Sequence, residues 1–461
     1  MMVKAFMPAP AATVTSANLM TMRLCPTILI GCLISISSIW ANDILPAASV
    51  GEPVLLYEGT LHPISGPPIS KGKLLMRAGL IVALGGESDT LEGEEGANRI
   101  SCEGQHVYPG LISANGTLGL VEISAVRATR DLSEPGPINP SVRAETAVNP
   151  DSELLPVARA NGILTTLSVP QGGIISGRSA LLQLDGWTWE DMVLKAPVGM
   201  HLYWPRMRTN SNASEDSIKS QRKNWEERLL KLETFFSEAR AYQKSKLAQT
   251  IAFRSDVRFE SMLPVIEGRL PLYVHALGVV EIQKALQFIA EQELKAVLVS
   301  GQDVWRVTSL LKARGIPVIL DTVQGLPLRR WEPYDSAMRV PAKLLEAGIP
   351  FCIANGSGSG GSSNARNLPY IAAAAVGEGF SADEALKAIT LSPAQILGVG
   401  DQLGSLEVGK LATLIVTNGN PLEITSNVQR AFVRGRQIDL SSKHTQLYRK
   451  YEEKQRRLQT P

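Results

Sequence analysis

Five histidines are the side chains of this 461-residue chain best suited to acid–base or metal chemistry: His62, His106, His201, His275 and His444. His275 ends the apolar segment PLYVHA, at the strand end where barrel enzymes place their sites. It is the candidate metal ligand, and the alternative is a core histidine hydrogen bonded to the backbone. His201 lies within a strand-like segment, where a satisfied core histidine is the expectation.

Small polar residues interrupt an apolar run in YPGLISANGTLGL, residues 108–120, and Asn115 and Thr117 stand where that strand ends. Asp321 ends another strand-like segment, IPVILD. Its carboxylate is the candidate general base, and Asp303 is the second choice if either carboxylate reaches inward. The alternative role for Asp321 is a salt bridge or a helix cap.

These residues need a parallel sheet to bring them together. Buried-looking strands cover 162–170, 198–204, 271–276, 295–300, 316–321 and 349–354. Helical patterns lie between most of them, such as the i, i+4, i+7, i+11 series of Trp225, Leu229, Leu232 and Phe236. The alternation predicts a (β/α)8 TIM-like barrel or a doubly wound sheet. With the stretch that opens the series there are seven strands, and no segment supplies the eighth.

Short strands separated by Gly and Pro turns occupy both chain ends, which predicts one small β-sandwich built from the two. Two loops follow strand ends on the side where barrel enzymes place their sites. The loop at 133–141 is rigid in composition, and the loop at 356–363 is flexible in composition. The predicted organisation is a signal peptide at 1–41, sandwich at 42–108 and 401–440, barrel at 109–400 and a charged tail at 441–461.

The N-terminus has the features of a secretory signal. Arg23 precedes an apolar run from Leu24 to Trp40, and Ala41 marks the break before polar residues. We expect an exported protein, periplasmic or extracellular, without a membrane span in the mature chain. The alternative is a lipoprotein cleaved before Cys32, within LIGC.

The charge balance gives no case for nucleic-acid binding, since 46 basic residues oppose 44 acidic ones and no polybasic block stands out. Cys102 and Cys352 remain after export, as one disulfide or as two buried thiols.

Several segments resemble the amidohydrolase superfamily, in particular its secreted imidazolonepropionase-like branch. PPISKGKLLMRAGLIVALGG is similar to the family's N-terminal sandwich, and GQHVYPGLI to the entry into its first barrel strand. The segments at 149–192 and 364–416 resemble that branch and its last helices with the returning sandwich. The resemblance covers nearly all of the chain after the signal and implies the barrel fold.

The resemblance also implies a divalent metal held by His-x-His on strand 1, later histidines and a last-strand Asp that serves as general base. Placed on this sequence, the His-x-His positions fall on Asn115 and Thr117, the next histidine is His275, and the one after falls near Ser300. The last-strand Asp falls near Asn355, where no carboxylate stands. The metal site is therefore degenerate, because amide and hydroxyl groups are weak ligands for zinc.

Two functions follow as expectations. The first is an exported hydrolase of non-peptide or cyclic C–N bonds, with a site rebuilt around His275, Asn115, Thr117, Asp321 and Arg366. The alternative is a non-catalytic protein of the same fold that binds a small ligand or pairs with an active homologous subunit. We expect no resident cofactor; a weakly bound zinc or other divalent metal is the other possibility.

Overall fold

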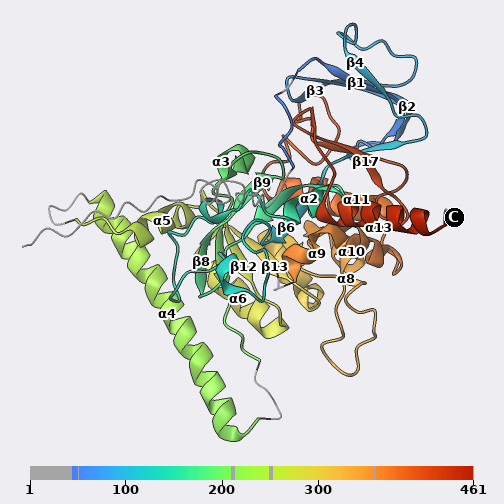
Figure 1. Ribbon diagram of the computed structural model, residues 1–461. Helices are drawn as coiled ribbons and strands as arrows, with labels where there is room; N and C mark the ends of the chain where they lie inside the picture. The colour runs from blue at the N-terminus through green and yellow to red at the C-terminus, as the bar shows by residue number, and fades with distance from the viewer. Residues whose placement is uncertain (1–43, 50, 209–212, 249–252, 358–359, 460–461) are drawn as a thin grey trace, which may run out of the picture. The chain divides into compact units, whose positions relative to one another are not determined.

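The computed structural model describes residues 44–49, 51–208, 213–248, 253–357 and 360–459 (Figure 1). The predicted signal peptide, including Cys32, lies outside the described residues. Cys102 and Cys352 are buried free thiols. No helix within the described ranges is both long and apolar enough to cross a lipid bilayer.

Strands from both chain ends form one sheet, in the order β18-β17-β16-β5-β1-β2-β3 with β4 beside β1. Figure 1 shows β1 to β4 together with β17. Residues of both ends, such as Leu56, Val107, Leu414 and Phe432, share one buried apolar cluster. The packing of two sheets into a sandwich stays a prediction. The strands are β1 Val54–Leu61, β2 Ile69–Arg77, β3 Leu80–Gly85, β4 Asn98–Ser101, β5 His106–Pro109, β16 Leu414–Thr417, β17 Val428–Val433 and β18 Arg436–Gln437.

The central strands form two further sheets, ordered β10-β9-β7-β6 and β15-β14-β13-β12-β11-β8. β6 pairs with β7 in parallel, and β11 to β15 are parallel in chain order. This mixed α/β arrangement is consistent with a TIM-barrel-type domain. The strands are β6 Leu111–Gly116, β7 Ile163–Ser168, β8 Ile175–Arg178, β9 Ala180–Gln183, β10 Val193–Lys195, β11 Met200–Tyr203, β12 Leu272–His275, β13 Ala296–Ser300, β14 Val318–Leu320 and β15 Phe351–Ile353.

An antiparallel segment stands between the two groups of parallel strands. β9 pairs with β7 and β8 pairs with β11, both antiparallel, with Ser179 between β8 and β9. The sequence pattern does not reveal this broken antiparallel segment, and the closure of the strands into a barrel stays a prediction.

Side chains of the parallel strands alternate between two apolar clusters, as the pleat requires. Val297 and Val299 of β13 join an inner cluster with Ile112 and Cys352. Leu298 joins the outer cluster, which includes the apolar residues of the surrounding helices. The parallel order of β11 to β15 places the polar side chains at their carboxyl ends along one edge of the sheet.

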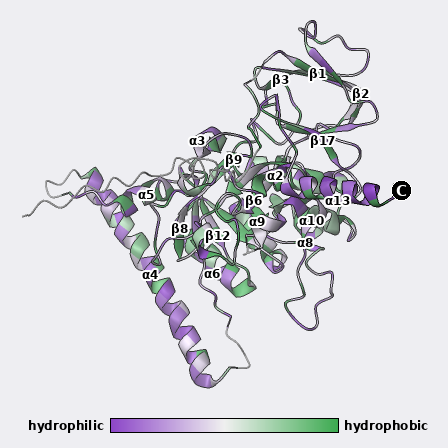
Figure 2. Cartoon of the chain, viewed as in Figure 1, coloured by the Kyte–Doolittle hydropathy of each residue, from purple (hydrophilic) through white to green (hydrophobic). Residues whose placement is uncertain are grey.

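The helices agree with the predicted patterns. Leu232 and Phe236 are buried in α4, and Ser381 caps α11 by accepting a hydrogen bond from the Glu384 N–H at 3.1 Å. The predicted tail forms α13 without a buried residue, and Figure 2 shows that helix as hydrophilic. The helices are α2 Leu154–Arg159, α3 Trp189–Met192, α4 Glu215–Leu247, α5 Val257–Ile266, α6 Val279–Glu291, α7 Thr308–Arg314, α8 Val340–Glu346, α9 Gly361–Asn364, α10 Leu368–Val376, α11 Ala382–Ala388, α12 Leu391–Ile396 and α13 Lys443–Gln459. Short 3₁₀ turns cover η1 Arg127–Thr129, η2 Ala144–Ala147, η3 Val304–Val307 and η4 Ala365–Asn367.

Candidate functional site

The carboxyl end of β6 is joined to the last strands by side-chain hydrogen bonds. The Ser113 hydroxyl donates to Asn355 Oδ1 at 2.5 Å, just beyond β15. The hydroxyls of Thr117 and Ser362 are 2.5 Å apart. We call the boundary between β6 and β15 the seam. No ladder joins these two strands among the described residues, and the Ile112 N–H donates instead to the Ile389 carbonyl at 2.9 Å.

Asp321 lies one residue beyond β14 and faces β6. Its Oδ1 accepts the Asn115 amide N–H at 2.5 Å and the Ser357 backbone N–H at 3.2 Å. Burial raises the pKa of Asp321 above its ordinary value, although the hydrogen bonds from Asn115 and Ser357 oppose the rise. The carboxyl therefore keeps its proton to a higher pH than an exposed aspartate does.

His275 lies at the end of β12 and pairs with a second histidine. Its Nε2 is 2.9 Å from Nδ1 of His201, on the neighbouring β11. The Tyr203 ring stacks on His275 with 4.1 Å between centroids. Burial lowers the pKa of His275 to about 3, and burial followed by the charge of His275 lowers that of His201. Both imidazoles are therefore neutral near pH 7.

The hydroxyl of Ser300 and the amide of Asn355 are also hydrogen bonded within the protein. The Ser300 hydroxyl donates to the Ala276 carbonyl at 2.6 Å, and the Asn355 amide donates to the Gly361 carbonyl at 3.0 Å. Both residues are buried. The bonds of Ser113, Asn115, Thr117 and Asn355 link β6 to the residues after β14 and β15 and to α9, and the Ser300 bond joins β13 to the residue after β12.

Arg366 lies apart from this network. Its side chain is exposed, and its Nη1 is 2.7 Å from Nδ1 of His444, on α13. Of the residues predicted for a rebuilt site, the structure therefore joins Asn115 to Asp321, and it brings Arg366 to the C-terminal helix instead.

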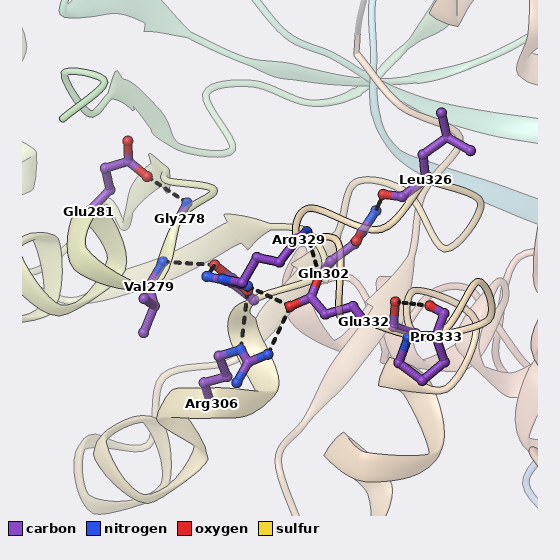
Figure 3. A network of polar contacts seen from close by, with 11 residues as sticks. Gly278, Val279, Glu281, Gln302, Arg306, Leu326, Arg329, Glu332 and Pro333 are labelled. Atoms are coloured by element: carbon purple, nitrogen blue, oxygen red, sulfur yellow. Dashed lines mark hydrogen bonds and ion pairs between the residues drawn. The ribbon is translucent and has the colours of Figure 1, made fainter. Parts of the chain in front are cut away.

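Asp303 is held in an ion-pair network rather than facing the strand ends. Arg329 Nη1 and Nη2 lie 2.7 and 2.8 Å from its two carboxylate oxygens, and Arg306 Nε lies at 3.2 Å. Glu332 accepts from both arginines, as Figure 3 shows. Burial alone would raise the pKa of Asp303, but the bonds and charge of Arg329 bring it below its usual value. The carboxylate anchors the loop after β14 and is not available as a base.

A cavity of about 520 Å³ lies beside these strand ends, under the loop that contains residues 133–141. Pro170, at the end of β7, lines it, and its carbonyl accepts the Tyr203 hydroxyl at 3.3 Å. The next residue, Gln171, donates through its side chain to the Ser357 carbonyl at 2.5 Å. Because Ser357 also donates its backbone N–H to Asp321, Gln171 connects the wall of the cavity with the surroundings of Asp321. Its polar wall comprises Asp131, Ser133, Glu134, Asn139, Ser141, Arg143 and Thr146.

The sequence analysis does not predict Ser113, Tyr203 or Ser357 as residues of this region. It takes His201 as a core histidine and does not predict that it contacts His275. A signal existed for one pair, because His201 and Tyr203 are two residues apart and share one face of β11. Nothing in the chain order indicates that Ser113 meets Asn355, which lies 242 residues away.

Known proteins share this architecture. The model of the amidohydrolase family matches residues 270–438. The imidazolonepropionase of Syntrophobacter fumaroxidans is 37% identical over 78 residues, which are 17% of this chain and 18% of that protein. The match thus spans less than a fifth of that relative's length.

Two solved structures extend the likeness to most of the chain. An amidohydrolase from Thermotoga maritima MSB8 has a TM-score of 0.73 at 24% identity, covering 84% of this chain and 99% of that one. An adenosine deaminase from Xanthomonas campestris has a TM-score of 0.52 at 16% identity, covering 89% and 99%. At these identities the likeness establishes the fold.

Proposed function

We propose that the chain is an amidohydrolase-family protein, with a closed barrel, that binds a small polar molecule at the carboxyl ends of its strands and does not hydrolyse it. One observation carries the proposal. The side chains at the positions where the family places metal ligands are hydrogen bonded to one another or to the backbone, as Thr117 is to Ser362 and Ser300 is to Ala276. They serve to join the strands.

A zinc ion of the family's kind does not fit this donor set. Zinc takes imidazole, thiolate or carboxylate ligands, usually three or four from the protein. Of the five positions that the resemblance assigns, His275 alone offers such a group, and its Nε2 is bonded to His201. Within the part of the chain that the structure describes, no three His, Cys, Asp or Glu side chains are grouped as a metal would need.

The ligand we infer is a small neutral molecule with N–H donors, such as a cyclic amide or a dipeptide amide. Asp321 is half-buried and offers carboxyl oxygens at the end of β14. The cavity under the 133–141 loop, about 520 Å³, has the size of a small-molecule site, and Asp321 lies outside its wall. We infer that the ligand extends from Asp321 toward this cavity past Gln171, because the Gln171 side chain and Asp321 both bond to the backbone of Ser357.

Titration of the purified protein with hydantoin and with glycyl-proline amide, by calorimetry and by product analysis, tests this proposal. We expect binding of at least one compound without turnover, and weaker binding in Asp321→Asn. Asp151→Asn, an exposed aspartate, is the matched control and keeps the affinity of the unmodified chain. Turnover of either compound, or affinity that Asp321→Asn leaves unchanged, contradicts the proposal.

The raised pKa of Asp321 favours a second candidate, a metal-free hydrolase in which this carboxyl transfers a proton. Such an enzyme would show turnover in the same assay, with loss of activity in Asp321→Asn. The hydrogen bonds from Asn115 and Ser357 argue for the binding role, because they hold the carboxyl in place.

Export is part of the proposal. Arg23, the apolar run from Leu24 to Trp40 and Ala41 support cleavage of a signal peptide, with lipidation of Cys32 as the alternative. N-terminal sequencing of protein from the periplasmic or culture fraction should give Asn42 as the first residue. A start near Met1, with the protein in the cytoplasmic fraction, contradicts export.

The proposal also includes pairing with an active homologous subunit. Such pairing would give a function to a chain that has no catalytic centre of its own. Co-expression with a homologue that has His-x-His on strand 1, followed by size-exclusion chromatography, should give a mixed oligomer. Separate elution of the two chains contradicts this pairing.

A further inference from the structure

The helix α13, Lys443–Gln459, has an apolar side that the rest of the protein does not bury. Leu447, Tyr451 and Leu458 follow the spacing i, i+4, i+11, so they lie along one side of the helix. Tyr448 flanks this row. The four side chains are between 43% and 71% exposed, and no residue of α13 is buried. Such a continuous apolar side exposed to water indicates an interaction surface.

Packing does not account for this helix. Its first turn is attached to the protein, where Arg366 Nη1 lies 2.7 Å from Nδ1 of His444. Farther along, Arg457 Nε donates to Glu453 at 2.8 Å, within the helix itself. Most helices of folded proteins are stabilised by burying an apolar side, and isolated helices of this length are only marginally stable in water. The apolar side of α13 therefore lacks the cover that usually stabilises such a helix.

The remainder of the α13 surface is basic. The helix contains six basic residues and two acidic ones, whereas the whole chain contains 46 and 44. One of the two acidic residues, Glu453, already forms ion pairs within the helix. Lys450 and Lys454 are exposed, and their positions are next to the apolar row on the helix surface. The basic residues are Lys443, Arg449, Lys450, Lys454, Arg456 and Arg457.

This combination suits the surface of an anionic lipid bilayer. A helix with an apolar side and a basic side lies in the plane of the interface, with its cations at the phosphate headgroups. Tyrosine is favoured at that depth, because its ring is apolar and its hydroxyl is polar. A second copy of the chain suits the surface less well, because two α13 helices would bring like charges together. A nucleic acid would leave the apolar side uncovered.

We propose that α13 binds the surface of an anionic lipid bilayer, with Leu447, Tyr451 and Leu458 in the interface and Lys450 and Lys454 at the headgroups. This surface is separate from the proposed ligand site at the carboxyl ends of the strands and does not depend on it.

Sedimentation of the full chain with lipid vesicles tests the proposal. One set of vesicles contains equal parts of phosphatidylglycerol and phosphatidylcholine, and the other contains phosphatidylcholine alone. We expect the chain to bind the anionic vesicles at least about tenfold more tightly, with an affinity that falls as sodium chloride is added. Equal affinity for the two sets, or no binding of anionic vesicles at millimolar lipid, overturns the proposal.

Two double variants test the two sides of α13 separately. Lys450→Gln combined with Lys454→Gln should weaken binding to anionic vesicles about tenfold or more, because each lysine contributes to the attraction. Leu447→Ser combined with Leu458→Ser should also weaken it about tenfold or more, because the apolar side then has less area to bury. Unchanged vesicle binding in either double variant, with circular dichroism showing a folded protein, overturns the proposal.

Matched controls come from exposed residues of α4. Lys219→Gln with Lys231→Gln, and Leu230→Ser with Leu247→Ser, should leave vesicle binding unchanged. All these variants share the same N-terminal apolar run, so a difference between them belongs to the substituted helix.

Two further measurements cover the other partners. A dimer found by size-exclusion chromatography without lipid, and abolished by the two leucine substitutions in α13, overturns the proposal in favour of a second copy of the chain. Tighter binding to duplex DNA than to anionic vesicles overturns it as well.

Discussion

The two ends of the parallel strands differ in what their polar side chains contact. At the carboxyl ends, Ser113, Asn115 and Thr117 each form a hydrogen bond with a residue much later in the chain. Their partners are Asn355, Asp321 and Ser362, in that order. At the amino ends, Lys295 and the Tyr273 hydroxyl have no partner among the described residues and line a cavity.

The carboxyl ends use most of their neutral polar side chains to join strands, because buried polar atoms are usually hydrogen bonded. Asn115 Oδ1 and His201 Nε2 are the atoms there without a partner among the described residues. The amino ends contribute to stability in most barrels, and here they retain a cavity with unpaired charge.

The largest expected effect concerns the seam. Asn355→Ala removes the acceptor of the Ser113 hydroxyl and the donor to the Gly361 carbonyl, both buried. We expect the free energy of unfolding to fall by roughly 2 to 3 kcal/mol, the usual cost of leaving such groups unpaired. Urea denaturation measures it, with exposed Asn364→Ala as the control. If Asn355→Ala and Asn364→Ala lowered the free energy of unfolding equally, the seam would not depend on the Asn355 amide.

The bond between Thr117 and Ser362 should give a smaller effect. A double-mutant cycle with Thr117→Val and Ser362→Ala should show a coupling energy of about 1 kcal/mol, since two buried hydroxyls 2.5 Å apart form one bond. Additive losses in the two single variants would refute a direct interaction.

A pH-dependent effect is expected at Asp321. Its native pKa is raised above the ordinary value of 3.8, so the folded state binds the proton more tightly than the unfolded state. The contribution of Asp321 to the free energy of unfolding is therefore fully present below the ordinary pKa of 3.8. It decreases as the pH rises through the native pKa. Asp321→Asn, which is neutral and of similar shape, should remove that slope in melting experiments between pH 4 and neutral. An unchanged slope would assign the pH dependence to other groups.

The smallest effect belongs to the amino ends. Lys295→Gln relieves repulsion of Lys195 and should stabilise the protein by a few tenths of a kcal/mol at low salt, less at high salt. Thermal melts at two salt concentrations measure this, with Lys231→Gln as the reference. Destabilisation by Lys295→Gln would indicate that the lysine has a partner.

The sequence predicts the parallel strands well because each is a short, largely apolar run that the fold buries. Segment 175–183 escapes prediction, because it breaks at Ser179 and its two halves pair with different strands. Strand ends also place Asn115 and Asp321 at one edge of the fold, since carboxyl ends of parallel strands meet there.

The partners of these residues cannot be predicted in the same way. The bond between Asn115 and Asp321 joins positions 206 residues apart, and its existence depends on how the strands are ordered in space. The exposure of Arg366 depends on the orientation of the short turn η4, which no periodic pattern specifies. The pairing of His275 with His201 depends on the register of β11 and β12, which places Tyr203 beside His275.

The central claim is that the carboxyl ends form a hydrogen-bonded structure in place of a metal centre. The metal content of the protein, purified without chelator, tests it most directly. Elemental analysis of the unmodified chain and of His275→Ala should give far less than one zinc per chain in both, even after incubation with zinc and desalting. One zinc per chain in the unmodified protein, lost in a folded His275→Ala variant, would contradict the account.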